Sequence, residues 1–266
     1  MKKQIPNIFT LLNLFFGCIA IVLALQTKNI NISMNDELTS SFNIPESIPA
    51  AALFLFAAAI VDFLDGFVAR LFKASSEMGK QLDSLADVVS FGVAPGVILY
   101  QLLRMSYMRE EDGLDKSILL LLPAFIYSCA AAYRLAKFNL DASQAYGFKG
   151  LPTPAAGLLI ASFPLILHFG NVFPAINSFM ADNVNDWMVN KWLLYGLIVF
   201  LSWLMVSNIP LMALKFKDFK PKNNLPILLL AGITLVAGIV LQWFAVPIVF
   251  IAYIILSLAL KNKATS

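Results

Sequence analysis

Eight long stretches of this chain are almost free of charge, and they constrain its fold more than any other feature. A helix that crosses a bilayer needs about 20 mainly apolar residues. Only helices and closed barrels satisfy every backbone group in hydrocarbon, and stretches of this length favour helices. The sequence therefore predicts an all-α, polytopic membrane protein with about eight transmembrane helices. The predicted spans are 8–26, 50–72, 82–104, 117–137, 153–169, 192–212, 225–241 and 244–260.

The composition leaves little room for a soluble domain. Hydrophobic residues make up 59% of the 266 residues and charged residues only 13%, whereas soluble domains carry about 25% charge. Mean hydropathy is +0.78. The N-terminal apolar run continues to Leu25 without a small-residue cleavage site. It therefore predicts a retained first helix and not a signal peptide.

Positive charge is distributed unevenly between the loops. Eight spans put both ends of the chain on one side, and with that side inside, 14 of the 19 Lys and Arg residues lie at inner positions. The positive-inside rule therefore places both termini, and short loops such as 72–81, in the cytoplasm. The formal net charge of +3 reflects this topology, and it does not indicate a nucleic-acid partner.

Four aspartates interrupt the apolar pattern. Asp62 and Asp65 fall in the inner half of the second predicted span, and Asp83 and Asp87 in the inner half of the third. A carboxylate at the centre of a membrane helix costs roughly 2.5–3.5 kcal/mol on insertion scales. Spacings of three and four residues put each pair on one helix face. We therefore expect the four side chains to lie at a similar depth, just below the inner interface.

Converging oxygen ligands of this kind suit Mg²⁺ or Mn²⁺, and such ions bring phosphates with them. Two other interpretations stay open on the residues alone. The acids could be helix caps or partners of Arg70, Lys73 and Lys80. They could also line a cation or proton pathway, because acids within membranes often mark one.

The full spacing of the acidic segment is distinctive. It reads Asp62-x2-Asp65-Gly66-x2-Ala69-Arg70-x8-Gly79-x3-Asp83-x3-Asp87. This resembles the signature of the CDP-alcohol phosphatidyltransferases at all eight fixed positions. The resemblance implies a six-helix membrane core, usually homodimeric, that displaces CMP from a CDP-linked lipid with the hydroxyl group of a second alcohol.

The same resemblance implies roles for individual residues. Asp62, Asp65, Asp83 and Asp87 would bind Mg²⁺ or Mn²⁺, and Asp87 would also act as the base. The nucleotide would lie against a second set of residues. By the resemblance its members are Gly66, Ala69 and Arg70, and Gly79 belongs to the same motif. From their place at the start of the first predicted span, Asn7 and Thr10 could also touch the nucleotide, although a helix N-cap explains Asn7 at least as well.

Four further segments, 5–17, 83–96, 133–140 and 148–157, resemble the phosphatidylserine synthase branch of this family. That branch implies CDP-diacylglycerol and L-serine as substrates. Relatives that use glycerol 3-phosphate typically carry arginine where this chain has Asn13. Glycerol 3-phosphate or inositol is the alternative acceptor within the family, and a cation or proton transporter is the alternative from another class.

A serine site needs a cation for the carboxylate and acceptors for the ammonium group. Arg134 lies at the inner end of the fourth predicted span, with Lys137 and Asn139 close by in sequence. A positive-inside anchor explains Arg134 equally well. Ser90 and Gly92 follow Asp87, where they would either form a wall for a small amino acid or pack two helices together.

We expect one integral-membrane domain over 1–266. Its catalytic core would occupy 1–212, with the motif at 62–87, and 213–266 would add a cytoplasmic loop and two membrane helices. The active site is expected to face the cytoplasm of a bacterial-type inner or plasma membrane. The expected partners are CDP-diacylglycerol, L-serine, the bilayer and a second copy of the chain.

Overall fold

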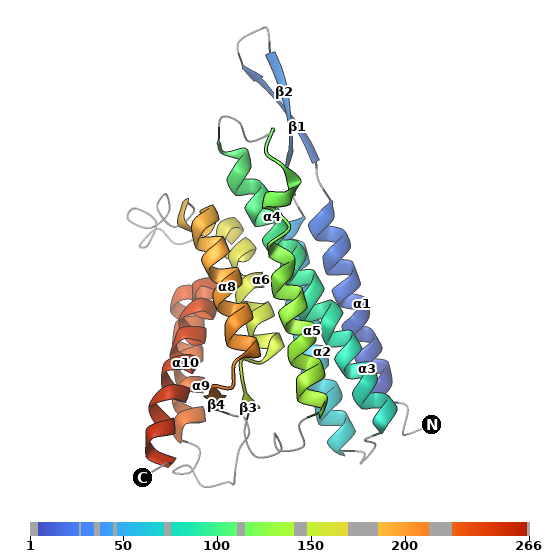
Figure 1. Ribbon diagram of the computed structural model, residues 1–266, viewed down its shortest axis with the longest axis vertical. Coiled ribbons are helices and arrows are strands. Elements are labelled where there is room, and N and C mark those ends of the chain that lie inside the picture. The colour runs from blue at the N-terminus through green and yellow to red at the C-terminus, as the bar shows by residue number, and fades with distance from the viewer. Residues whose placement is uncertain are drawn as a thin grey trace.

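The structure is a computed structural model that describes residues 5–26, 28–34, 38–44, 47–71, 76–110, 115–140, 148–169, 186–212 and 225–264. Its main elements are long helices that run roughly side by side (Figure 1). In chain order they are α1 (Ile5–Leu25), α2 (Ile48–Leu71), α3 (Glu77–Asp87), α4 (Ala94–Met108), α5 (Ala124–Leu140), α6 (Thr153–Phe169), α8 (Lys191–Val206), α9 (Leu225–Leu241) and α10 (Ala245–Ala264).

Four helical segments of the described chain are long and apolar enough to cross a membrane, and they comprise Pro6–Leu25, Ile48–Val68, Glu77–Met108 and Ile227–Ala259. Two shorter apolar helices accompany them, Thr153–Phe169 and Lys191–Val206. The last long segment contains a break. The 3₁₀ turn η7 (Gln242–Phe244) divides it, and Gln242 has a positive φ of 49°. Because α9 and α10 pack against each other, this stretch is a helical hairpin. The prediction of an all-α membrane protein is confirmed.

The strands of the described chain lie outside the helical bundle. β1 (Lys28–Met34) pairs with β2 (Leu38–Ile44) in an antiparallel hairpin, with Ile30 opposite Phe42. Figure 1 shows this hairpin projecting from the end of the bundle opposite to the end where α2 stops and α3 begins. The hairpin occupies the polar segment between the first two predicted spans. The hairpin forms because β-branched and apolar residues alternate with polar ones in both halves of the segment.

Three helix ends differ from the predicted spans by five residues or more, each for a local reason. The third helix begins at Glu77 and not at 82, because the Ser76 side chain caps its first turn by accepting a hydrogen bond from the Gly79 N–H at 3.0 Å. α5 begins at Ala124 and not at 117, since the preceding residues form the 3₁₀ turn η3 (Ile118–Leu120). α8 ends at Val206, before the short strand β4 (Pro210–Leu211).

The third helical segment is the centre of the bundle. α3 continues through the π-helical segment η2 (Val88–Val93) into α4 without a break. α4 contacts α1, α5, α6 and α8, and its Leu99, Leu102 and Leu103 are fully buried. α1 packs along α2 through small residues such as Ala24 and Ala51, which let the two backbones approach closely. The second half of the acidic motif, Asp83 and Asp87, therefore lies at the start of this central segment.

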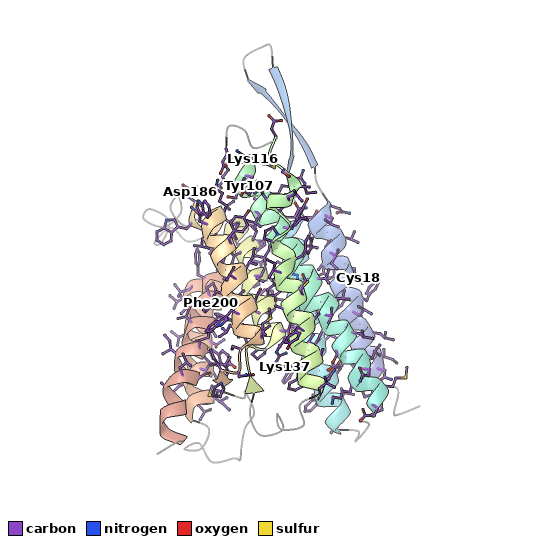
Figure 2. All side chains as sticks on the ribbon, viewed as in Figure 1. Cys18, Tyr107, Lys116, Lys137, Asp186 and Phe200 are labelled. Atoms are coloured by element: carbon purple, nitrogen blue, oxygen red, sulfur yellow. The ribbon has the colours of Figure 1, made fainter. Side chains whose placement is uncertain are left out.

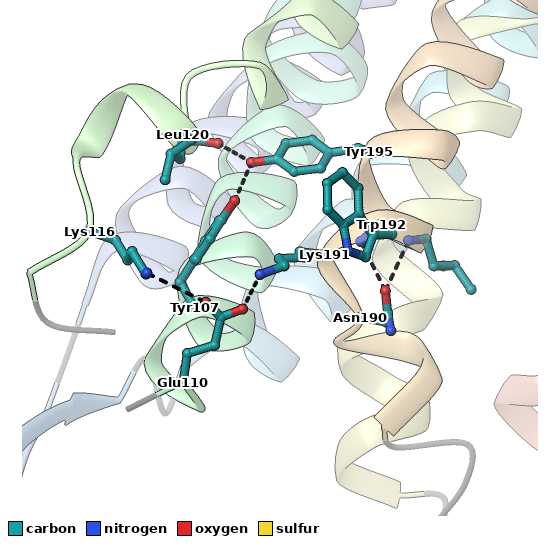
Figure 3. A network of polar contacts seen from close by, with 9 residues as sticks. Tyr107, Glu110, Lys116, Leu120, Asn190, Lys191, Trp192 and Tyr195 are labelled. Carbon is teal, nitrogen blue, oxygen red and sulfur yellow. Dashed lines mark hydrogen bonds and ion pairs between the residues drawn. The ribbon is translucent and has the colours of Figure 1, made fainter. Parts of the chain in front are cut away.

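A polar network ties the helices together at the end that carries the hairpin (Figure 3). Glu110 pairs with Lys191 and, at 3.9 Å, with Lys116. The Tyr195 hydroxyl lies 2.9 Å from the Tyr107 hydroxyl and donates to the Leu120 carbonyl oxygen at 2.6 Å. In Figure 2 this network lies at the opposite end of the bundle from Lys137. It fixes the ends of α4 and α8, and it is remote from the acidic motif.

At the other end of the bundle, β3 (Phe148–Lys149) pairs with β4 over two residues, and Gly150 beside this pairing has a φ of +78°.

We expect Gly150→Ala to destabilise the protein by at least the roughly 1–2 kcal/mol that the left-handed region costs an L-residue. A Cβ at Gly150 would lie only 2.5 Å from the Met205 carbonyl oxygen. Thermal unfolding in detergent would measure the effect. Gly196→Ala is the control, since its Cβ would meet nothing within 4 Å. A melting temperature of Gly150→Ala equal to that of the wild type would contradict the prediction.

Candidate metal and substrate site

The acidic motif forms a cluster where the C-terminal half of α2 faces α3. Asp62 and Asp65 come from α2, and Asp83 and Asp87 from α3. One carboxylate oxygen from each of Asp62, Asp83 and Asp87 lies within 4.8 Å of the other two. Asp87 is 8% exposed and the other two are half-buried. The two acidic faces therefore meet, and three carboxylates share one small space.

Asp65 is held in a different way from the other three. Its Oδ2 accepts a hydrogen bond from the Thr10 hydroxyl of α1 at 2.8 Å, and its side chain is 7% exposed. It still lies close enough to interact electrostatically with Asp62, Asp83 and Asp87. The structure thus brings all four predicted carboxylates together, with three at one point and Asp65 bonded to α1.

Helix capping and pairing with Lys80 do not account for the cluster. The N-cap of α3 is Ser76 and not an aspartate. Lys80 donates from Nζ to the Asn139 carbonyl oxygen at 3.4 Å. Among the described side chains, none forms an ion pair with the four carboxylates within 4.0 Å. Lys73 and the side chain of Arg70 lie outside the described residues.

A divalent cation fits the donors that are present. Three carboxylates at this separation repel one another, and the described side chains do not offset that repulsion at close range. Hard oxygen donors are the ligands that Mg²⁺ and Mn²⁺ prefer. Two ligands of one Mg²⁺ stand at most about 4 Å apart at metal–oxygen distances of 2.0–2.1 Å. Three oxygens within 4.8 Å of one another therefore need only a small inward shift to bind a single ion. Asp62, Asp83 and Asp87 are therefore the residues that would hold such an ion.

Helix α1 reaches this cluster because small residues let it approach. A Cβ on Gly17 would lie 2.8 Å from the Ser90 Cα, so only glycine allows this contact between α1 and η2. A Cβ on Gly79 would lie 3.2 Å from Asn7 Oδ1. The two glycines thus set α1 directly against α3 and η2, and they bring its polar side chains to the acids.

Asn13 is a site residue that sequence reasoning did not place among the candidates. It is 0% exposed, and its Nδ2 donates to Asp87 Oδ1 at 3.3 Å. Its backbone carbonyl oxygen accepts from the Ser90 hydroxyl at 3.0 Å. The available signal was the spacing of Thr10, Asn13 and Gly17. Steps of three and four residues put these non-apolar positions on one face of an otherwise apolar helix.

Arg134 is a buried cation that interacts electrostatically with the cluster. It extends from α5, is 7% exposed, and donates from Nη1 to the Thr153 hydroxyl at 2.8 Å. Its guanidinium lies over the Phe138 ring at 5.6 Å and interacts electrostatically with Asp87. Its Nε has no hydrogen-bond partner within the described part of the chain. A buried polar atom without a partner costs about 1–3 kcal/mol, and more when charged, so this donor is available to a ligand.

The structure places the other predicted serine-site residues in contacts between helices and loops. Lys137 donates from Nζ to Asn208 Oδ1 at 2.7 Å, and Asn139 donates to the Ser84 hydroxyl at 2.7 Å. The Ser90 hydroxyl is bonded to Asn13, and a Cβ on Gly92 would lie 3.2 Å from Ala131 of α5. These contacts favour the packing interpretation for Ser90 and Gly92.

The predicted nucleotide residues fall around the same end of the bundle. Thr10 bonds to Asp65, and Asn7 lies beside Gly79. Gly66 is half-buried on α2, one residue after Asp65. Ala69 and Arg70 belong to α2, but their side chains lie outside the described residues.

Comparison with known proteins identifies relatives over most of the chain. The similar proteins include curated proteins named CDP-diacylglycerol--serine O-phosphatidyltransferase. That of Bacillus subtilis strain 168 is 40% identical over 129 residues, which are 47% of this chain and 68% of the relative. That of Helicobacter pylori strain J99 is 34% identical over 86% of this chain and 79% of the relative. That of Mycobacterium bovis is 29% identical over 94% and 75%, respectively.

The family model described as CDP-alcohol phosphatidyltransferase matches residues 3–203. The match includes the whole acidic motif, and it extends from α1 through most of α8, the six spans of the expected core. It ends before α9 and α10. On this similarity, and on the acidic cluster that the fold assembles, the chain belongs to the CDP-alcohol phosphatidyltransferase family.

Proposed function

We propose that this protein transfers the phosphatidyl group of CDP-diacylglycerol to the hydroxyl group of L-serine, which gives phosphatidylserine and CMP. The observation that carries the proposal is the similarity, over 86% of the chain, to a relative named for this reaction. The buried acidic cluster supports the transfer chemistry. The buried Arg134, with an unpartnered Nε, supports an acceptor that carries a carboxylate.

The transfer forms one bond to phosphorus and breaks another. The serine hydroxyl oxygen attacks the phosphorus that bears diacylglycerol, and the bond from that phosphorus to the oxygen of CMP breaks. Asp87 takes the hydroxyl proton, because Arg134, the proposed ligand of the serine carboxylate, interacts electrostatically with this member of the cluster. CMP leaves with the electron pair of the broken bond. Asn13, through its hydrogen bond to Asp87 Oδ1, keeps the carboxylate oriented.

Divalent metal use is general in this family, and we propose Mg²⁺ or Mn²⁺ here, held by Asp62, Asp83 and Asp87 with Asp65 beside them. When bound, such an ion neutralises charge on the diphosphate and on the departing CMP. Thr10 holds the Asp65 carboxylate in place from α1. We assign the nucleotide to the surface around Gly66, Gly79 and Asn7, and to Ala69 and Arg70 by the family motif.

Arg134 would bind the carboxylate of serine. A guanidinium group matches a carboxylate in geometry and in charge. The hydrogen bond from Arg134 Nη1 to the Thr153 hydroxyl already fixes the guanidinium group. Its Nε–H is therefore oriented before serine binds. Lys137, Asn139, Ser90 and Gly92 stay candidates for the same serine pocket, although each also makes a contact between helices or loops.

The site is proposed to face the cytoplasm, because the positive-inside rule puts the α2–α3 loop there. Serine would enter from the cytosol, and the lipid from the inner leaflet of a bacterial-type plasma membrane. The division into a core at 1–212 and an appended unit at 213–266 stays a prediction, as does the homodimer. The described helices α9 and α10 contact the bundle mainly through α6 and through Trp243, whose ring lies 5.4 Å from that of Phe56.

The first test supplies the purified protein with CDP-diacylglycerol and labelled serine. We expect labelled phosphatidylserine and CMP in equal amounts with Mg²⁺ or Mn²⁺, and neither product after chelation by EDTA. Adding either ion back should restore the rate, because three converging carboxylates need a cation to accept a diphosphate. Full activity in EDTA would contradict the metal site. Labelled lipid with glycerol 3-phosphate or inositol, and none with serine, would contradict the acceptor.

A further inference from the structure

Asn13 carries one buried atom that the reaction described above does not use. Its amide nitrogen bonds to Asp87, and its backbone carbonyl oxygen accepts from Ser90. Its side-chain oxygen Oδ1 is buried and has no hydrogen-bond partner among the described residues. Buried polar atoms are nearly always paired in native proteins, so an unpaired one at a site indicates a ligand atom.

The described chain has three other buried side-chain atoms of this kind, on Gln101, Arg134 and Ser202. Gln101 bonds to Ala24 through its amide nitrogen and belongs to the contact between α1 and α4. Ser202 lies on α8. Arg134 differs from these two, because it interacts electrostatically with Asp87, to which Asn13 is bonded.

An unpaired acceptor and an unpaired donor are thus both linked to Asp87. Asn13 is hydrogen-bonded to this carboxylate, and its Oδ1 can accept a further hydrogen bond. Arg134 interacts electrostatically with the same carboxylate, and its Nε–H can donate one. A small amino acid with a side-chain hydroxyl offers the matching groups, namely an ammonium, a carboxylate and a hydroxyl. A phosphorylated or purely hydroxylic acceptor has no ammonium group for the amide oxygen.

We propose that Asn13 Oδ1 accepts a hydrogen bond from the ammonium group of the acceptor, and that Asn13 thereby selects an amino alcohol. The inference rests on the proposed function and adds a specificity residue to it. Asn13 then has two tasks. Its nitrogen orients Asp87, and its oxygen places the acceptor so that the hydroxyl faces the same carboxylate.

The test compares two acceptors in the full-length protein, L-serine and 3-hydroxypropionate, which has the same hydroxyl and carboxylate but no ammonium group. Asn13→Leu removes the amide oxygen at similar side-chain volume. We expect the ratio of kcat/KM for serine to that for 3-hydroxypropionate to fall about tenfold to 150-fold in this variant. That is the range expected for a buried hydrogen bond to a charged group. CMP release measures both rates.

Thr10→Val is the matched control. Its hydroxyl bonds to Asp65 from the same face of α1, one turn earlier. It should lower both rates together and leave the acceptor ratio unchanged. An unchanged ratio in Asn13→Leu, with both rates lowered, would overturn the inference, because Asn13 would then only orient Asp87. In that case serine would still be the acceptor, and the proposed function would stand.

A second measurement covers a variant that folds but does not turn over. In the presence of CDP-diacylglycerol and Mg²⁺, L-serine should raise the unfolding temperature of the wild type more than 3-hydroxypropionate does. Asn13→Leu should lose this difference, and a retained difference would overturn the inference. If Asn13→Leu does not fold, Asn13→Ser takes its place in both measurements with the same expectations. A wild type that is inactive with serine would overturn the proposed function and this inference together.

Discussion

Asp87→Asn should lower the turnover number with serine by about a hundredfold to ten-thousandfold, the range expected for loss of a positioned general base. Asparagine keeps an oxygen at the same place, while Asp62 and Asp83 remain as ligands. CDP-diacylglycerol binding should therefore be largely retained. Initial rates of CMP release give the first quantity, and equilibrium binding of the CDP-lipid gives the second.

The control for this variant is Asp186→Asn. This variant makes the same substitution at an aspartate that forms an exposed ion pair with Arg109, at the far end of the bundle. Exposed ion pairs contribute about 0–1 kcal/mol, so rate and stability should both stay close to those of the wild type. A near-normal rate for Asp87→Asn would show that another group accepts the proton.

Arg134→Ala should raise the KM for serine about tenfold to 150-fold, because a charged hydrogen bond in a buried site contributes roughly 1.5–3 kcal/mol. The KM for CDP-diacylglycerol should change far less, since Arg134 lies on α5 beside Thr153 and the diphosphate is assigned to α2 and α3. Steady-state kinetics with each substrate varied in turn would separate the two constants.

Two comparison variants complete this test. Arg134→Lys keeps the charge but loses the planar donor group, so its serine KM should fall between those of the wild type and Arg134→Ala. Arg109→Gln removes an arginine whose partner Asp186 is exposed, and it should leave both constants unchanged. Equal increases in the two KM values for Arg134→Ala would remove Arg134 from the serine pocket.

The sequence predicted the helices best where hydropathy alone determines them. The spans 153–169 and 225–241 coincide with α6 and α9. It was less accurate where a polar side chain or a turn sets the end, as at Ser76 before α3 and in the 3₁₀ turn before α5. Hydropathy averages over a window, so it does not register a single capping hydroxyl group.

The meeting of the acids followed from spacing, because each aspartate pair repeats at three or four residues on its own helix. The partners of those acids did not follow. Asn13 and Asp87 are 74 residues apart in sequence, and Thr10 and Asp65 are 55 apart. Such contacts depend on how α1 crosses α3, which is set by two glycines whose close approach is visible only in three dimensions.

The π-helical segment after Asp87 has a consequence for the whole third span. A π turn takes in one residue more than an α turn, which rotates everything beyond it by about 100° relative to a regular helix. The residues before η2 thus present their carboxylates to α2, while Gly92 near its end and Gly96 beyond it are turned toward Ala131 and Ser128 of α5. One uninterrupted rod meets two neighbours with two different chemical surfaces, and shortening it by a single residue would put those surfaces out of phase.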